Sequence, residues 1–133
     1  MVTPALLSGD GFDMAKKILA VDDSASMRQM VLFTLQGAGY EVVQACDGVE
    51  ALDWARESTV DLVLTDVHMP RMDGITLVRE LRGLSGYKFV PMLILTTESS
   101  QEKKMDGKRA GATGWIVKPF NPPQLLATVA RVI

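Results

Sequence analysis

The strongest constraint on the fold is a regular alternation between short apolar runs and segments with helical spacing. The apolar runs are rich in Val, Ile and Leu, and three of them are apolar nearly throughout. Continuous apolar runs of this length are typical of strands buried on both faces of a parallel sheet. The predicted strands are residues 17–21, 41–45, 61–65, 91–95 and 114–117.

The segments that follow these runs carry apolar residues at helical spacing. In the first, Val31 and Leu35 share one face, and Ser24 or Ser26 precedes them as a candidate N-cap. In the last, Asn121 is followed by proline, which is favoured at the first helical position. The predicted helices are residues 27–38, 49–57, 74–83, 100–110 and 122–133.

The fourth of these helices is predicted to be weakly held. Its apolar residues are few, chiefly Met105 and Ala110. Gly107 lies in its middle, where glycine costs about 1 kcal/mol relative to alanine. We therefore expect this helix to be the most easily displaced part of the fold.

Strict alternation of five strands and five helices predicts an α/β fold of the (βα)5 type. The expected sheet is doubly wound, parallel and five-stranded, with helices on both faces. We assign residues 14–133 to this one domain and residues 1–13 to a flexible N-terminal tail, with Met14 as a possible alternative start. The chain reaches its end with the fifth helix, so no effector domain is expected.

Composition narrows the classes of partner and the cellular compartment. The net charge of −2 gives no electrostatic footprint for nucleic acid, and no apolar run approaches the roughly 20 residues that a membrane span needs. The N-terminal segment lacks the Lys or Arg of a signal peptide. A single cysteine, Cys46, cannot form an internal disulfide, which favours a cytoplasmic location, and we expect its side chain to be at least partly buried.

Polar side chains follow four of the predicted strands at the point where each strand ends. Asp22 and Asp23 follow the first strand, Asp66 the third, Thr96 the fourth and Lys118 the fifth. In an open parallel sheet, ligands bind outside the carboxyl ends of the strands, where the strand order reverses. We therefore expect these five side chains to meet in one crevice.

Three carboxylates in one crevice repel one another unless a cation lies among them. Lys118 offsets one negative charge. A hard divalent cation with oxygen ligands would offset the others, and Mg²⁺ bound by carboxylates and water suits such a site. The spacing of the residues thus predicts a Mg²⁺ site.

Four short motifs at these strand ends resemble those of the receiver domains of two-component response regulators. They are VDDS at 21–24, LTDVHMPRMDG at 64–74, LTT at 95–97 and VKPF at 117–120. The resemblance covers residues 16–133 and is closest to the stand-alone chemotaxis type, which implies a flavodoxin/CheY-like fold. It also implies a cis peptide bond between Lys118 and Pro119.

The resemblance implies that Asp66 is the phosphoacceptor, which takes its phosphoryl group from a sensor histidine kinase. Asp23 and Asp66 would bind Mg²⁺ directly, Asp22 would act through water, and the backbone carbonyl of His68 would be a further ligand. The side chain of His68 is the only imidazole in the chain. It would flank the phosphoryl group and tune its hydrolysis together with Glu98, or remain exposed without such a role.

The resemblance also assigns a switch. Thr96 would bind the phosphoryl oxygen and Lys118 would pair with Asp66. Thr96 would then move, and an aromatic side chain on the fifth strand would respond. Tyrosine is expected at that position, and this sequence has Trp115. The indole would either rotate into the space near Thr96 or pack beside the fourth helix in both states.

On this reading the protein is a monomeric signalling switch, not an enzyme beyond its Mg²⁺-dependent phosphorylation and dephosphorylation. A chemotaxis kinase would phosphorylate it, and the face built from the fourth helix, the fifth strand and the fifth helix would bind the flagellar motor switch or another protein. Neither nucleic acid nor a membrane is an expected partner.

Other functions remain open at the level of the sequence. The domain could be a phosphorelay intermediate, a phosphate sink or an unphosphorylated docking module. A haloacid-dehalogenase-type phosphatase would need Asp-x-Asp, but His68 occupies the third position. A flavodoxin-like FMN protein would need a phosphate-binding loop after the first strand, and none is present there.

Overall fold

The computed structural model describes residues 15–133, so the predictions for residues 1–13 and for Met14 lie outside the described residues. Five parallel strands form one sheet in the order β3-β2-β4-β5-β6. From β2 the chain adds β3 on one side of the sheet and then β4, β5 and β6 on the other. The strand order therefore reverses at β2, and a ligand crevice is expected there, between β2 and β4. The strands are β2 (Lys17–Val21), β3 (Glu41–Ala45), β4 (Leu62–Thr65), β5 (Met92–Thr96) and β6 (Gly114–Val117).

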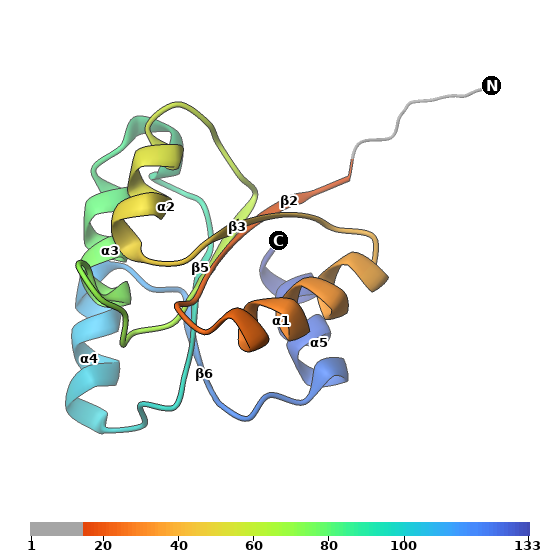
Figure 1. Ribbon diagram of the computed structural model, residues 1–133. Helices are drawn as coiled ribbons and strands as arrows, with labels where there is room; N and C mark the ends of the chain where they lie inside the picture. Colours follow the sequence, from red (N-terminus) through yellow and green to blue (C-terminus); the bar gives the residue numbers. More distant parts are fainter. Residues whose placement is uncertain (1–14) are drawn as a thin grey trace.

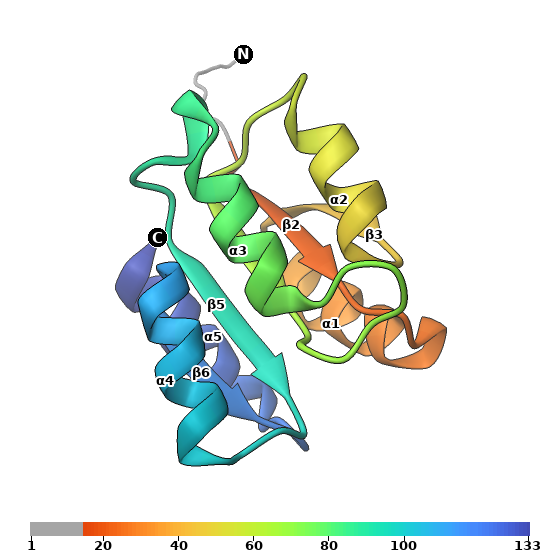
Figure 2. The same cartoon turned by 90° about the vertical axis from the view of Figure 1, so that its left-hand side faces the viewer.

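Helices cover both faces of the sheet, which confirms the predicted doubly wound fold. One face carries α1 and α5, and the other carries α2, α3 and α4 (Figures 1 and 2). A single 3-10 turn, Ser85–Tyr87, lies between α3 and β5. The helices are α1 (Ala25–Gly37), α2 (Gly48–Ala55), α3 (Gly74–Arg82), α4 (Gln101–Ala110) and α5 (Pro122–Val132).

The helix starts follow from the capping residues. The hydroxyl of Ser24, not that of Ser26, accepts a hydrogen bond from a free amide in the first turn of α1, that of Met27. Asn121 caps α5 in the same way, and proline follows at its first position as predicted. A side-chain acceptor at the N-cap satisfies an amide that has no partner within the helix, which fixes where the helix begins.

The core consists of two apolar layers, one on each face of the sheet. Leu35 of α1 and Val129 of α5 are fully buried against one face, and Leu77 and Leu81 of α3 against the other. The central strands β4 and β5 are buried along their whole length. This explains why their sequences are continuously apolar.

Helix α4 and the residue that follows the edge strand β3 are less well buried than the core. In α4 only Gly107 and Ala110 are buried, as expected for the weakly held helix. Cys46 is exposed, so the prediction of a partly buried thiol was wrong. The residue follows β3, which is an edge strand of the sheet and is covered by neighbours on one side only.

Two further features are one cis peptide bond and the lengths of the helices. The Lys118–Pro119 peptide bond is cis, as the resemblance implied. Within residues 15–133, none of the helices combines the length and the apolar character needed to cross a bilayer.

Candidate functional site

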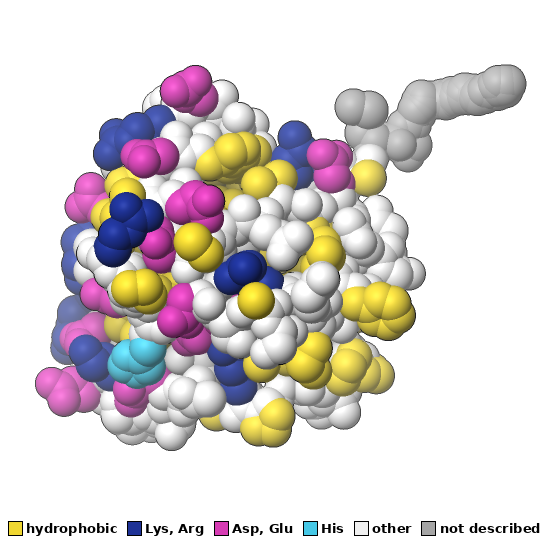
Figure 3. All heavy atoms as spheres, viewed as in Figure 1, with side chains coloured by type: hydrophobic (Ala, Val, Ile, Leu, Met, Phe, Trp, Pro, Cys, Tyr) yellow, Lys and Arg dark blue, Asp and Glu magenta, His cyan; other side chains and the backbone are white. Residues whose placement is uncertain are grey.

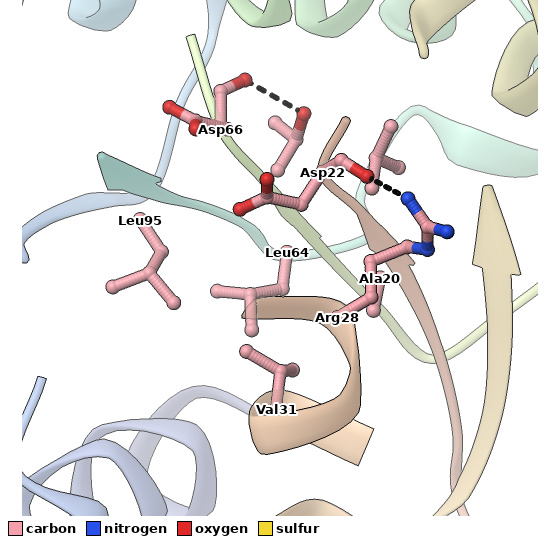
Figure 4. Close-up of a pocket in the computed structure, with 9 residues that line it drawn as sticks. Ala20, Asp22, Arg28, Val31, Leu64, Asp66 and Leu95 are labelled. Atoms are coloured by element: carbon pink, nitrogen blue, oxygen red, sulfur yellow. Dashed lines mark hydrogen bonds between the residues drawn. The ribbon is translucent and has the colours of Figure 1, made fainter. Parts of the chain in front are cut away.

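The register of the central strands brings Asp22 and Asp66 together. Val21 of β2 pairs with Thr65 of β4, so the aspartates that follow these residues leave the sheet side by side. The amide of Asp66 donates to the carbonyl of Val21, which extends the ladder by one residue and fixes the backbone of Asp66. Both aspartates are buried, and Figure 4 shows them at the ends of neighbouring strands.

Lys118 links the two carboxylates. Its Nζ lies 2.8 Å from Asp22 Oδ2 and 2.9 Å from Asp66 Oδ2, and its side chain is only 9% exposed. Burial alone would lower the pKa of Lys118, but the hydrogen bonds to Asp22 and Asp66 outweigh burial and raise it. The ammonium group is therefore charged at neutral pH, and it lies between the two buried carboxylates.

A third carboxylate completes the acidic cluster. Asp23 is exposed, and one carboxylate oxygen from each of Asp22, Asp23 and Asp66 lies within 4.8 Å of the others. Three carboxylates and one lysine leave an excess of two negative charges. The donors are hard oxygen atoms, which are the ligands that Mg²⁺ prefers, so the residues present fit this ion.

Backbone amides hold the two buried carboxylates in place. Val67 donates to Asp66 Oδ1 at 2.6 Å, and Ser24 donates to Asp22 Oδ1 at 2.9 Å. Arg28 of α1 donates to the carbonyl oxygen of Asp22 at 2.6 Å (Figure 4). Asp66 Oδ1 and Oδ2 therefore each have a fixed donor, which leaves the carboxylate with little rotational freedom.

These three contacts were not anticipated. Backbone amides carry no side-chain signal, and the role of Arg28 depends on the angle at which α1 leaves the sheet. Beneath the carboxylates the crevice has an apolar floor that includes Val31, Leu64 and Leu95 (Figure 4). An apolar floor limits access of water from below, so the charges interact more strongly than they would in bulk water.

Gly74 allows the loop after β4 to pass close to the site. A Cβ atom at this position would overlap the carbonyl oxygen of Asp66, so any larger residue would displace the phosphoacceptor candidate. The same loop is closed by a hydrogen bond from the Gly74 amide to the carbonyl of Val67. The glycine of the MDG motif is thus required by a close backbone approach.

The predicted switch residues are connected through the backbone of Glu98, whose N–H bonds to one and whose carbonyl bonds to the other. Thr96 is fully buried, and its Oγ1 accepts a hydrogen bond from the Glu98 amide at 3.2 Å. The indole N–H of Trp115 donates to the Glu98 carbonyl oxygen at 2.9 Å. The Trp115 ring also packs on Gly107 of α4, where a Cβ atom would lie 2.8 Å from the ring. A continuous chain of contacts therefore runs from Thr96 to α4.

His68 and Glu98 meet above the site. Nε2 of His68 lies 2.9 Å from Glu98 Oε1, and the imidazole is 59% exposed. Hydrogen bonds from Ser100 and His68 lower the pKa of Glu98 to about 2. The His68–Glu98 pair thus joins the loops after β4 and β5 at the surface. On the face shown in Figure 3, charged side chains gather over α2, α3 and α4, whereas hydrophobic ones lie over α1.

The structure brings the predicted residues together in three groups. Asp22, Asp66 and Lys118 are in direct contact, and Asp23 lies beside them. Thr96 and Trp115 are joined through the backbone N–H and carbonyl of Glu98, and the His68 side chain contacts the Glu98 carboxylate. The carbonyl of Glu98 had no predicted role.

Residues 18–130 match the response regulator receiver domain family. Among solved structures, the chemotaxis protein CheY4 of Vibrio cholerae is 57% identical, with a TM-score of 0.87 over 90% of this chain and 100% of that one. The receiver domain of the sensor histidine kinase PA1611 from Pseudomonas aeruginosa, solved with a magnesium ion coordinated in its active site cleft, is 28% identical. Its TM-score is 0.83, over 90% of this chain and 98% of that one.

The curated relatives are longer proteins. The DNA-binding response regulator MtrA of Mycolicibacterium paratuberculosis is 40% identical over 116 residues, which are 87% of this chain and 50% of that protein. The chain therefore spans about half the length of the curated relatives that it matches.

Proposed function

The chain belongs to the response regulator receiver domain family, and on that premise we propose that Asp66 is its phosphoacceptor. The observation that carries the proposal is the contact of Lys118 with both Asp22 and Asp66 inside a cluster of three carboxylates. An ordinary helix cap or turn would need neither the buried lysine nor the second and third carboxylates. The arrangement instead suits a site that takes up a negatively charged group and offsets the charge of that group.

The reaction would be an in-line transfer to a carboxylate oxygen of Asp66. A bond forms between that oxygen and phosphorus while the bond from phosphorus to the histidine nitrogen of the kinase breaks, and the nitrogen keeps the electron pair. Mg²⁺, when bound, supplies charge neutralisation. Asp22, Asp23, Asp66 and the backbone carbonyl of His68 would hold it. Lys118 would neutralise one phosphoryl oxygen, and the Thr96 hydroxyl would donate to another.

Phosphorylation by a small acyl phosphate tests this assignment without the kinase. Acetyl phosphate and Mg²⁺ should phosphorylate the protein, and the Asp66→Asn variant should remain unmodified. Lys118→Met should still bind the donor but accept the phosphoryl group far more slowly, because it lacks the fixed cation. Equal rates in wild type and Asp66→Asn would refute the proposal.

Thr96 and Trp115 form the proposed switch. The Thr96 hydroxyl accepts from the Glu98 amide in this structure, so turning it toward a phosphoryl group would release that amide. The carbonyl of the same residue holds the Trp115 indole, so the change would reach the packing of α4. Beryllium fluoride, which mimics the acyl phosphate, should change the Trp115 emission in a Trp54→Phe background. Thr96→Val should abolish that change.

We assign His68 and Glu98 to the lifetime of the phosphorylated state. Their hydrogen bond lies between the two loops that border the phosphorylation site, where the two side chains would limit the approach of water to an acyl phosphate. His68→Asn should therefore change the rate of phosphate loss. An unchanged rate would leave His68 with its backbone carbonyl as its only role.

The output surface would be formed by α4, β6 and α5. A hollow of about 330 Å³ lies between α4 and β6 on this surface, lined by Lys104, Lys108 and Trp115 among others. Two lysines beside an aromatic ring suit an acidic partner segment with an apolar anchor. Pull-down with the phosphorylated protein, compared with Asp66→Asn, should recover a protein only in the phosphorylated sample, and Lys104→Glu should weaken that capture.

The likeness to CheY4, which covers the whole of that chain, supports a chemotaxis histidine kinase upstream and the flagellar motor switch downstream. In this role the domain acts as a monomeric cytoplasmic switch and not as a metabolic enzyme. MtrA is a DNA-binding regulator, but the net charge of −2 gives this chain no footprint for DNA. Transfer of phosphate from Asp66 to a second histidine protein would instead indicate a phosphorelay intermediate or a phosphate sink.

A further inference from the structure

We infer that Asp47 and Arg71 form a clamp that positions the loop carrying the His68 carbonyl, and that this clamp sets the affinity for Mg²⁺. The inference rests on the proposed function, because it concerns the proposed metal site. Arg71 lies in the loop between β4 and α3, and Asp47 precedes α2, so the clamp joins segments 24 residues apart in sequence. Both would be positioning residues, since neither contacts the acidic cluster.

The contact between the two side chains is bidentate. Arg71 Nε donates to Asp47 Oδ2 at 3.0 Å, and Nη2 donates to Oδ1 at 3.1 Å. The carboxylate also caps α2 by accepting the Glu50 amide at 2.9 Å. The Asp47 side chain is only 7% exposed. A buried carboxylate with these partners has one favourable orientation, so it is a rigid anchor for the guanidinium.

The backbone of Arg71 needs such an anchor. Its φ of 70° lies in the left-handed region, and it is the only residue other than glycine with positive φ in residues 15–133. That conformation is disfavoured for a residue with a Cβ atom, because the Cβ atom comes too close to the carbonyl oxygen that follows it. Strained conformations persist where surrounding contacts over-determine them, and the ion pair to Asp47 provides two hydrogen bonds to the Arg71 side chain.

A second contact presses the same loop against α2. A Cβ atom at Gly48 would lie 2.7 Å from the carbonyl oxygen of Met72 and 2.8 Å from its Cβ. The first residue of α2 therefore touches the loop directly beside the ion pair. At the other side, the Gly74 amide closes the loop onto the carbonyl of Val67 at 2.9 Å. The loop is thus pinned at its base and at its tip.

The proposed metal ligand lies between these two pins. His68 follows Val67 at the base and precedes Arg71 at the tip by three residues. Its side chain is mostly exposed and contacts another loop through Glu98, so the direction of its carbonyl depends on the backbone of the pinned loop. Without the clamp the loop would sample other conformations, and only a fraction would present the carbonyl correctly. The apparent dissociation constant rises in inverse proportion to that fraction.

Mg²⁺ binding by calorimetry tests the clamp directly. Arg71→Gln should weaken Mg²⁺ binding about 10-fold, the lower end of the range for groups that orient metal ligands. Asp47→Ser keeps a capping oxygen but removes the ion pair, and it should have the same effect. The double variant should be no weaker than either single variant. Arg109→Gln, which breaks the exposed Arg109–Asp106 pair in α4, is the matched control and should bind as wild type.

A glycine variant separates positioning from stability. Arg71→Gly relieves the positive φ while it removes the ion pair, so its free energy of unfolding should stay close to that of wild type. Its affinity for Mg²⁺ should still fall about 10-fold. Unchanged affinity in both Arg71→Gly and Arg71→Gln would overturn the inference.

Amide hydrogen exchange without Mg²⁺ distinguishes failure of the clamp from failure of the proposed function. Residues 67–73 should exchange faster in Arg71→Gln than in wild type, while α1 should be unchanged. If wild type bound no Mg²⁺ at all, the proposed function would fail, and this exchange experiment would still show whether the clamp holds the loop. Equal exchange in the two proteins would overturn the clamp.

Discussion

Replacement of Asp23 by asparagine should stabilise the metal-free protein and weaken its response to Mg²⁺. The carboxylate oxygens of Asp22, Asp23 and Asp66 lie within 4.8 Å of one another. Lys118 contacts the other two but not Asp23. Asp23 therefore faces the two negative charges of Asp22 and Asp66 and the one positive charge of Lys118. The net repulsion on the Asp23 carboxylate is that of about one negative charge.

The size of this repulsion follows from the distance. At 4.8 Å, Coulomb's law gives about 1 kcal/mol in water and about 3.5 kcal/mol at an effective dielectric constant of 20. Asp23 is exposed, so we expect a gain of about 1–2 kcal/mol in the free energy of unfolding of Asp23→Asn without Mg²⁺. Mg²⁺ at 100 times its dissociation constant should raise the free energy of unfolding of the wild type by about 2.7 kcal/mol. The same Mg²⁺ concentration should raise that of the variant much less.

Urea unfolding with and without Mg²⁺ measures both effects. The order of stability should invert: the variant is the more stable protein in EDTA, and wild type is the more stable protein in saturating Mg²⁺. Asp53→Asn is the control, because Asp53 is an exposed acid of α2 outside the cluster. Its stability should change by less than about 0.5 kcal/mol in either condition. Loss of stability in metal-free Asp23→Asn, or an equal gain from Mg²⁺ in both proteins, would show that Asp23 is neither repelled by its neighbours nor a ligand of the metal.

Three further predictions concern a glycine of α4, a glycine of α1, and Glu98 in the loop before α4. Gly107→Ala should destabilise the protein by up to about 2 kcal/mol, because a Cβ atom 2.8 Å from the Trp115 ring overpacks the site and outweighs the gain in helix propensity. Gly37→Ala in α1 meets no atom within 4 Å and should stabilise by about 0.5–1 kcal/mol; urea unfolding of both variants checks the contrast. Hydrogen bonds from Ser100 and His68 lower the pKa of Glu98 to about 2, so its contribution to stability is present above the ordinary pKa and is lost as the pH falls through about 2. Glu98→Gln should therefore flatten the dependence of stability on pH between about 4.5 and 2, and an unchanged slope in acid unfolding curves would contradict this.

The architecture and the centre of the site could be predicted because both follow from local patterns. Continuous apolar runs identify buried strands, and the parallel arrangement sends every strand end to the same edge of the sheet. Asp22 and Asp66 are neighbours for that reason alone, since their preceding residues pair in register. The capping residues fixed the helix starts to within one or two positions.

Other features depend on tertiary placement and leave no local signal. The Asp47–Arg71 pair joins residues 24 apart, and nothing in the sequence specifies which acid faces Arg71. The amide of Val67 and the carbonyl of Glu98 belong to the backbone, so their roles cannot be inferred from residue type. The exposure of Cys46 depends on β3 lying at an edge of the sheet.

Peptide mass spectrometry after incubation with acetyl phosphate identifies the phosphorylated residue and is the most direct test of the role of Asp66. With Mg²⁺, one phosphoryl group should appear on the peptide that contains Asp66, and hydroxylamine should remove it because it is an acyl phosphate. With EDTA, the modification should be absent or strongly reduced. A stable phosphoryl group on His68, or modification that persists in Asp66→Asn, would show that Asp66 is not the phosphoacceptor.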